Sequence, residues 1–367
     1  MQHSDDPTKV SPRVARLLPV YAFLLAGCLS TSNFPAPTPG SRPLADQSEK
    51  FGHTLEMRYL GNSGFLFRRG GYAIVTGPFY TNPHWLRAGL WRIRPDTALI
   101  DWLHPKLPPS AVEAILVGHA HYDHLMDVPY IARKHHPLAT LYGSPTAINL
   151  SLASEPSLAD RLVSLDKQVS RDGAMGVWQY VSDGRIRFMA LAAEHGPHNY
   201  GVHLMRGRVT AVPRSMPRSA WSWKEGETFA YLIDFMAEDR KTVDFRIYYA
   251  DATTKGRTGL PPEFDAADSH RIDLAILSVG SANVLKGYPE IFLDSYRPRT
   301  IVLGHWENFF RTPVDGVFRM RVTHLTEFID IVEERMAPDA RWILPRPGST
   351  YHLEFETTQL PAEGKID

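Results

Sequence analysis

The stretch AILVGHAHYDHLMDVP, from Ala114 to Pro129, decides the fold and the chemistry that we expect of this chain. An apolar run leads directly into three histidines and one aspartate within six positions. Alternate side chains of an extended segment face the same way, so His119 and His121 can point at one ion. Asp123 and His124 follow where the chain turns toward a helix, so they can reach a second point beside the first. Because imidazole and carboxylate are the usual ligands of zinc and neighbouring metals, the stretch predicts a metal site behind a buried strand.

Three single residues farther along the chain repeat this placement, each just after an apolar strand. His195 follows IRFMALAAE, Asp251 follows DFRIYYA and His305 follows TIVLG. Loops at strand ends in layered α/β proteins share one edge of a sheet, so we expect all four strand ends to meet at one site. His198 is an alternative to His195 as a ligand, but His195 lies directly at the strand end and is preferred.

The sequence leaves two alternatives for the role of each of three residues near these ligands. His198 and Tyr200 are candidates for substrate contact or proton donation, or loop residues satisfied by their neighbours. Glu307, two positions after His305, is either a partner of a metal ligand or an acid.

Three smaller expectations concern packing. Tyr122, inside the motif, is expected to pack against the core. His135 and His136 follow a predicted helix and are expected on the surface. The stretch YGVHLMRG, residues 200–207, is expected to be a strand.

The whole chain has an ordinary globular composition, with 367 residues, a formal net charge of +0, 43% apolar and 22% charged residues. A chain of this length can bury a large core. The balanced charge lacks the basic excess of a nucleic-acid-binding protein, so we expect no nucleic-acid partner. The single cysteine lies near the N-terminus, which leaves no disulfide framework and no cysteine nucleophile for the folded body.

The N-terminal segment has the features of an export signal. Lys9, Arg13 and Arg16 precede the apolar run LLPVYAFLLAG, which ends at Cys28 and is too short to span a membrane. LAGC resembles the bacterial lipoprotein box. This resemblance implies a signal peptide over residues 1–27, lipid attachment at Cys28 and membrane anchoring at the cell envelope, on the outer membrane or periplasmic face in a Gram-negative host. A plain signal peptide or a short anchor helix is the alternative.

The remaining chain predicts one folded domain. Residues 28–50 are rich in Ser, Thr and Pro and predict a flexible tether. Two strand-rich halves, each followed by helices, predict an α/β domain over residues 51–360, with two packed sheets and helices outside, and a C-terminal tail at 361–367. The basic, tryptophan-bearing segment 206–227 is either a lip that attracts an anionic or lipid substrate or a solvated insertion.

The HAHYDH motif, followed by a histidine, an aspartate and a last histidine at strand ends, resembles the metallo-β-lactamase superfamily. The likeness runs from YLGNSGFLF to VLGHWENFF. It implies an αββα sandwich of two mixed β-sheets with a two-metal site at one edge. The branch that contains ascorbate-6-phosphate lactonase and N-acyl-phosphatidylethanolamine phospholipase D has the most similar texture. By this resemblance His119, His121 and His195 hold one metal, Asp123, His124 and His305 hold the second, and Asp251 bridges them.

The chain departs from this family at one position. Many members have an aspartate after the second sheet strand, in a TDP turn that supports the ligands, whereas this chain has TGP with Gly77. Supports of this kind change metal affinity or activity by about 10–100-fold. We therefore expect that another group replaces the aspartate or that the site is tuned differently.

Two such metal ions would lower the pKa of a shared water and provide hydroxide, so the site predicts hydrolysis of an ester, lactone, amide or phosphodiester. Asp123 and Asp251 are the predicted catalytic carboxylates, with His198 as a candidate proton donor. Zinc fits the thiolate-free ligand set, and manganese or iron also accepts it. A redox or oxygen-reducing role on the same fold is disfavoured, because such a site would usually have a glutamate at the position of His121. The expected substrate is a small molecule or a lipid, such as a phospholipid or N-acyl lipid, and the alternative is a non-catalytic envelope lipoprotein that retains a metal site.

Overall fold

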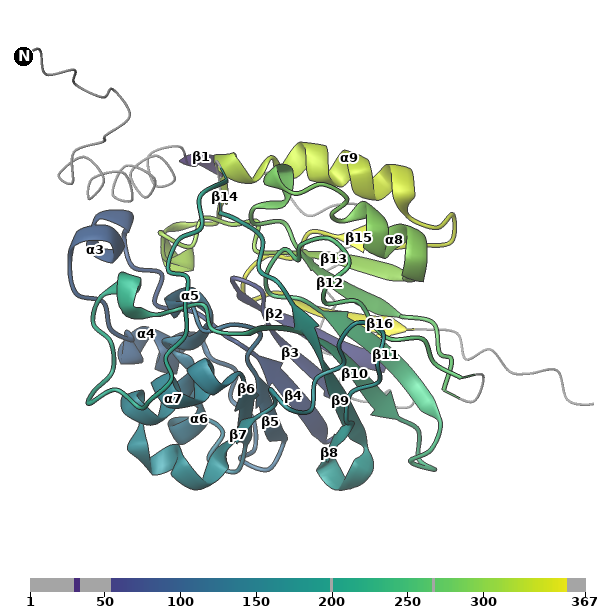
Figure 1. Cartoon of the computed structure of the whole chain (residues 1–367), viewed down its shortest axis with the longest axis horizontal. Helices are drawn as coiled ribbons and strands as arrows, with labels where there is room; N and C mark the ends of the chain where they lie inside the picture. The colour runs from purple at the N-terminus through teal and green to yellow at the C-terminus, as the bar shows by residue number, and fades with distance from the viewer. Residues whose placement is uncertain (1–29, 34–53, 199–200, 266–267, 355–367) are drawn as a thin grey trace, which may run out of the picture.

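The computed structural model describes residues 30–33, 54–198, 201–265 and 268–354. Two seven-stranded sheets pack face to face, and helices cover their outer faces (Figure 1). The predicted αββα sandwich of two mixed sheets is therefore confirmed. The predicted signal peptide, Cys28, most of the predicted tether and the C-terminal tail lie outside the described residues.

The first sheet is antiparallel at one side and parallel at the other. Its strand order is β16-β2-β3-β4-β5-β6-β7, with parallel pairing from β4 to β7. Strand β5, which leads into the HAHYDH motif, is buried on both faces, as its nearly continuous apolar sequence requires. The strands are β2 (Thr54–Gly61), β3 (Gly64–Arg69), β4 (Tyr72–Thr76), β5 (Val112–Leu116), β6 (Thr140–Gly143), β7 (Leu162–Ser164) and β16 (Thr350–Glu354).

The second sheet repeats this division. Its order is β15-β13-β12-β11-β10-β9-β8, with antiparallel pairing from β8 to β11 and parallel pairing from β11 to β15. The strands are β8 (Gln179–Val181), β9 (Ile186–Ala193), β10 (Thr228–Met236), β11 (Val243–Tyr249), β12 (Leu274–Ser278), β13 (Thr300–Gly304) and β15 (Arg341–Ile343).

Short helices complete the two outer layers. Helices α4, α6 and α7 lie beside the first sheet, and α8 and α9 cover the second (Figure 1). Ser144 caps α7 by accepting a hydrogen bond from the backbone of Ala147. The α-helices are α3 (Trp85–Leu90), α4 (Thr97–Leu103), α5 (Tyr122–Leu125), α6 (Val128–Lys134), α7 (Pro145–Ser154), α8 (Glu290–Tyr296) and α9 (Leu325–Arg335). The 3-10 helices are η1 (Pro156–Arg161), η2 (Ser182–Gly184), η4 (Ala220–Ser222), η5 (Ala282–Val284), η6 (Pro313–Asp315) and η7 (Arg321–Thr323).

Apolar side chains fill the space between the sheets and both spaces between a sheet and its helices. Phe65, Phe188 and Tyr231 are fully buried between the two sheets. Burying a side chain of this kind contributes about 1.5–3 kcal/mol relative to leaving it exposed. This packing provides a rigid support for the loops at the strand ends, where the predicted ligands lie.

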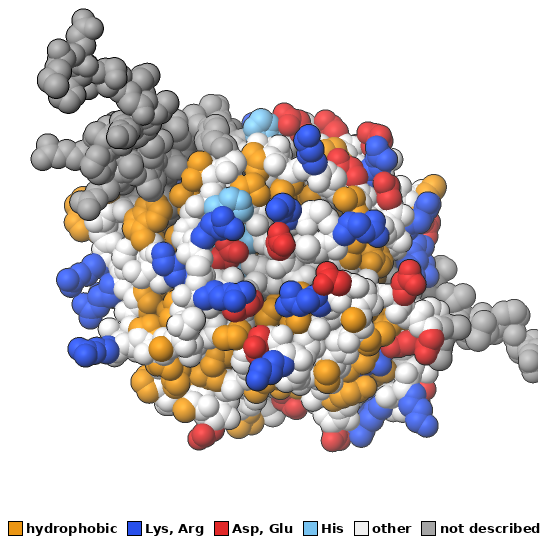
Figure 2. Space-filling model, in the orientation of Figure 1, with side chains coloured by type: hydrophobic (Ala, Val, Ile, Leu, Met, Phe, Trp, Pro, Cys, Tyr) orange, Lys and Arg blue, Asp and Glu red, His pale blue; other side chains and the backbone are white. Residues whose placement is uncertain are grey.

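Three further observations concern the predicted tether, the helices and the surface. Strand β1 (Ser30–Asn33), inside the predicted tether, pairs antiparallel with β14 (Phe318–Met320). In the part of the chain that the structure describes, no helix has the length and apolar character needed to cross a bilayer. Basic and acidic side chains are interspersed on the face drawn in Figure 2, as expected from the balanced charge.

Candidate metal centre

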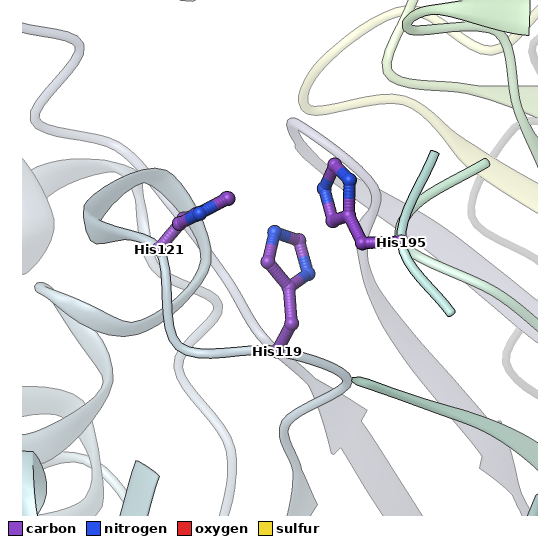
Figure 3. A group of neighbouring side chains, drawn as sticks. All are labelled: His119, His121 and His195. Atoms are coloured by element: carbon purple, nitrogen blue, oxygen red, sulfur yellow. The ribbon is translucent and has the colours of Figure 1, made fainter. Parts of the chain in front are cut away.

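All seven predicted ligands converge at one edge of the sandwich. Their potential ligand atoms form three overlapping groups, and within each group these atoms lie within 4.8 Å of one another. Figure 3 shows the rings of His119, His121 and His195 facing a common space. The groups are His119, His121 and His195; His119, His124 and Asp251; and Asp123, His124 and His305.

Four strands deliver these side chains. The HAHYDH motif follows β5, His195 follows β9, Asp251 follows β11 and His305 follows β13. Gly118 allows the first and third of these segments to meet, because a Cβ at this position would lie 2.3 Å from Asp251 Oδ1. His305 has a left-handed backbone with φ of 55°, which is uncommon outside glycine and is often found at functional sites.

Asp251 lies between His119, of the first group of ligands, and His124, of the third. Its Oδ1 is 3.0 Å from His119 Nδ1, and its Oδ2 is 3.6 Å from His124 Nδ1. The second carboxylate, that of Asp123, has its Oδ2 3.4 Å from His124 Nε2 and 3.5 Å from His305 Nε2. Each carboxylate therefore faces two imidazoles.

Electrostatics favours negative charge on both carboxylates. Burial alone would raise the pKa of Asp123, but His124 and His305 more than offset this effect and hold that pKa well below its usual range. Burial would likewise raise the pKa of Asp251, and His119 and His124 lower it overall. Burial lowers the pKa of His124 to about 3, so its imidazole stays neutral and can offer a lone pair to a cation.

Several buried atoms of the cluster have no hydrogen-bond partner among the described residues. His121 Nε2, His124 Nδ1 and Asp251 Oδ2 are buried, and none has a hydrogen-bond partner among the described residues. A buried polar atom that lacks a partner is costly, because burial removes its hydrogen bonds to water. Cations held by these atoms would remove this cost, so the donor set fits the two divalent metal ions that the sequence predicts.

His195, and not His198, belongs to a group with ligand geometry. His195 Nδ1 lies 2.5 Å from the carbonyl oxygen of Gly196 and donates to it, which leaves Nε2 for a metal. His198 Nδ1 accepts a hydrogen bond from the backbone of Leu204 at 3.2 Å. His198 lines the cavity that all seven candidate ligands also line, which we call the metal cavity. Tyr200 lies outside the described residues.

Two residues behind the ligands support them: Asn62, which the sequence did not predict, and Glu307. Asn62 Nδ2 donates to the carbonyl oxygen of Asp123 at 2.6 Å and to its Oδ2 at 3.2 Å. The carboxylate of Glu307 accepts hydrogen bonds from the backbone of Asn62 and the hydroxyl of Tyr59, and this hydroxyl accepts one from the backbone of His305. Glu307 does not line the metal cavity, so its contacts favour the supporting role over that of an acid.

Gly77 is explained by a close approach of the backbone. A Cβ at this position would lie 2.9 Å from the carbonyl oxygen of His124, so an aspartate could not enter without moving the ligand segment. Asn62 contacts the same segment from the turn between β2 and β3 and supports Asp123 directly. The expectation of a replacement for the missing aspartate thus has a candidate in Asn62.

Two expectations about packing were wrong. His136 is fully buried, and His135 is largely buried, because α6 ends at Lys134 and the chain then turns inward. Residues 201–207 form no strand; two residues of this loop, Leu204 and Met205, line the metal cavity instead. In the predicted lip, Trp223 is fully buried, so this segment is not simply a solvated insertion.

Tyr122 packs as expected, with its ring 6.0 Å from that of Phe79 in an edge contact. It also lines the metal cavity. Its hydroxyl is buried and has no hydrogen-bond partner among the described residues, a feature that the sequence did not predict.

The comparisons with known proteins give distant structural likenesses only. No family model matches the chain, and no curated protein matches it. Igni18, a metallo hydrolase from the archaeon Ignicoccus hospitalis, is 15% identical, with 83% of this chain and 100% of that chain covered and a TM-score of 0.45. The metallo-β-lactamase fold protein YhfI from Bacillus subtilis is 12% identical over 82% and 99%, with a TM-score of 0.43. CmlA, a diiron β-hydroxylase from Streptomyces venezuelae, is 13% identical over 83% and 55%, also at 0.43.

Proposed function

We propose that this protein is a metal-dependent hydrolase that cleaves an ester, lactone or phosphodiester with two divalent cations. One observation carries the proposal: seven imidazoles and carboxylates from four strand ends meet at a cavity, and three of their buried atoms have no hydrogen-bond partner among the described residues. Structural clusters of buried polar groups satisfy their own hydrogen bonds, so unpartnered atoms that converge favour a bound ion.

The side chains have separate roles. His119, His121 and His195 would hold one cation, and Asp251 would be shared between the two. Such cations, when bound, lower the pKa of water and polarise the bond under attack. The second cation would be held by Asp123, His124 and His305.

The protein supplies orientation and charge. The carboxylates of Asp123 and Asp251 balance part of the positive charge in a buried place, and the hydrogen bonds from Asn62 fix the position of Asp123. Ligands fixed in advance need no reorganisation during the reaction.

His198 is the proposed hydrogen-bond donor to the substrate. Because its Nδ1 accepts the N–H of Leu204, the ring proton lies on Nε2. Burial lowers the pKa of His198 to about 4, so the ring is neutral near pH 7 and offers this N–H to an oxygen of the substrate or of the leaving group.

Zinc is the proposed metal, with manganese or iron as alternatives, since the ligand set has imidazoles and carboxylates and no thiolate. Action at the cell envelope, with a lipid anchor at Cys28, is part of the same proposal and is supported by the LAGC segment alone. The proposed substrate is a small molecule or a lipid.

Metal analysis and an activity screen test this proposal. The purified full-length chain, loaded with zinc or with manganese, should bind about two equivalents of metal and hydrolyse at least one of a lactone, a carboxylic ester and a phosphodiester. A chain that binds two equivalents without hydrolysing any of these would support the non-catalytic alternative, and a chain that binds no metal would refute both.

A further inference from the structure

We infer that the metal cavity takes an uncharged ester or lactone with an apolar chain, in preference to an anionic phosphodiester. This inference rests on the proposed function and narrows its substrate class.

The cavity has a continuous apolar wall beside the ligands. Met205, Phe310 and Met320 line it and are only 8%, 4% and 5% exposed, because each also packs in the core between the first sheet and its helices. Leu204 and Phe309 are half-buried beside them. The wall comes from the loop before β10, the loop after β13 and strand β14, so separate segments present apolar side chains to one space.

The wall begins directly at the group formed by Asp123, His124 and His305. The ring of Phe309 lies 5.2 Å from that of His305 in an edge contact, and the rings of Phe309 and Phe310 are 4.5 Å apart. A substrate whose reacting bond lies at the ligands would therefore place the neighbouring part of its chain on these two rings. Burial of apolar groups here stabilises the complex in proportion to the area that leaves water.

Among the described residues that line the same cavity, none is a Lys or Arg. Apart from the candidate ligands and His198, the polar side chains there are hydroxyls such as those of Thr253, Ser281 and Thr323. A phosphodiester carries a negative charge shared by two oxygens. The two proposed cations would balance the charge of an oxygen that they bind. A charged oxygen that lies against the carbon atoms of the wall would have no such partner, which is far more costly than burying an ester oxygen there.

Basic side chains gather in a neighbouring cavity instead. Arg171, Arg206, Arg208 and Lys255 line this second cavity, which shares only His195 with the metal cavity. Two of them have acidic partners, since Arg208 lies 2.9 Å from Glu227 and Lys255 lies 3.6 Å from Glu194. The basic groups are thus placed outside the space that the reacting bond would enter.

Hydrolysis by the zinc-loaded full chain tests the substrate class. The probes are p-nitrophenyl acetate, butyrate and hexanoate, with bis(p-nitrophenyl) phosphate as the anionic comparison. We expect kcat/KM to rise by about fourfold for each added methylene. The phosphodiester should be the poorer substrate. Equal rates along the ester series, or faster turnover of the phosphodiester, would overturn the inference while leaving the proposed function intact.

Variants of the wall locate the effect. Phe309→Ala should remove most of the chain-length preference, and Phe309→Arg should also raise turnover of the phosphodiester relative to the esters. Phe309 is half-buried, so both variants should fold. Leu138→Ala, at a side chain that is 61% exposed and outside the cavity, is the matched control and should behave as the wild type. Wild-type preference in both Phe309 variants would contradict the inference.

Equilibrium binding separates the two proposals. Hexanamide, which is uncharged, should bind the zinc-loaded chain in a calorimetric titration, and Phe309→Ala should weaken this binding by about 10-fold or more. If the amide binds in this way but no ester or phosphodiester is hydrolysed, the hydrolase proposal fails and the inferred ligand class stands. Absence of binding together with absence of ester hydrolysis would overturn the inference.

Discussion

The candidate metal centre can be compared with a second group of buried histidines, formed by His104 and His136 beyond the C-terminal ends of α4 and α6. In this second group Tyr80 Oη lies 3.0 Å from His104 Nδ1, and His104 Nε2 lies 2.8 Å from His136 Nε2. The imidazoles therefore satisfy most of one another's hydrogen bonds, and His136 Nδ1 is their buried atom without a hydrogen-bond partner among the described residues. In the metal centre three such atoms converge, on His121, His124 and Asp251.

The two groups also differ in charge. Burial lowers the pKa of both His104 and His136, so both rings are neutral. The carboxylate near them, that of Asp101, is partly exposed and is bound by His135 and Lys134. The metal centre instead buries two carboxylates among its imidazoles. Burial of histidine alone is thus a poor indicator of a metal site, and unpartnered atoms together with buried negative charge are a better one.

The largest expected effect comes from removing the shared carboxylate. Asp251→Ala should abolish binding of at least one metal equivalent and lower kcat/KM by about 10³-fold or more, because it removes a ligand and a buried charge. Gly118→Ala should have a similar effect, since its Cβ would occupy the space of the Asp251 carboxylate. Atomic absorption and steady-state kinetics measure both quantities.

His136→Gln is the control for this experiment, because it changes a buried histidine that has no place in the ligand groups. It should retain both metal equivalents. If Asp251→Ala keeps the wild-type metal content and turnover, or if His136→Gln loses metal, the distinction between the two groups of histidines is wrong.

The pH dependence of stability should reveal the second group. Burial lowers the pKa of His136 to about 4, whereas an unfolded histidine titrates near pH 6.5. The unfolded state therefore binds more protons between these values. Stability from this residue is fully present above about pH 6.5 and is lost as the pH falls toward 4.

The variant His136→Gln tests this effect in urea unfolding of the metal-free chain at pH 7 and pH 4.5. The wild type should lose up to about 3 kcal/mol more unfolding free energy than the variant over this range. Parallel losses in both proteins would mean that His136 is protonated in the folded state and that the buried pair is not neutral.

A smaller effect is expected from the support of Asp123. Asn62→Ala removes two hydrogen bonds to this residue, so metal affinity should fall by about 10–100-fold while the fold is retained. Competition with a chelating dye measures the affinity. Asn149→Ala is the matched control, since Asn149 bonds to the backbone of Val209 and does not line the metal cavity. Unchanged metal affinity in Asn62→Ala would contradict the hypothesis that Asn62 replaces the aspartate that is missing at Gly77.

The sequence predicted the two sheets and the convergence of the ligands because both depend on local patterns. Apolar strands of five to nine residues are readable from composition, and a strand end fixes where the next polar residue lies. Asp251 and His305 could thus be assigned without knowledge of their distance from His119.

Features that depend on contacts between distant segments could not be predicted. Asn62 has no local pattern that marks it as a support, and its partner Glu307, for which the sequence left two roles open, lies 245 positions away. His136 was expected on the surface because it follows a helix, and nothing local shows that the chain turns inward there. Residues 201–207 were expected to be a strand, but Leu204 and Met205 line the metal cavity.

The smallest expected effect is on unfolding free energy, when the hydroxyl of Tyr59, which is hydrogen-bonded, or that of Tyr122, which is not bonded to any described residue, is removed. Tyr59 Oη bonds to Glu307 and accepts hydrogen bonds from the backbones of Ser63 and His305, so Tyr59→Phe should cost about 1–3 kcal/mol of unfolding free energy. Tyr122 has a buried hydroxyl without a partner among the described residues, so Tyr122→Phe should change stability by less than about 0.5 kcal/mol or increase it. Urea unfolding of both metal-free variants measures the difference. Equal losses would show that Tyr122 has a partner in the folded chain, and the missing partners of the metal ligands would then need the same direct test.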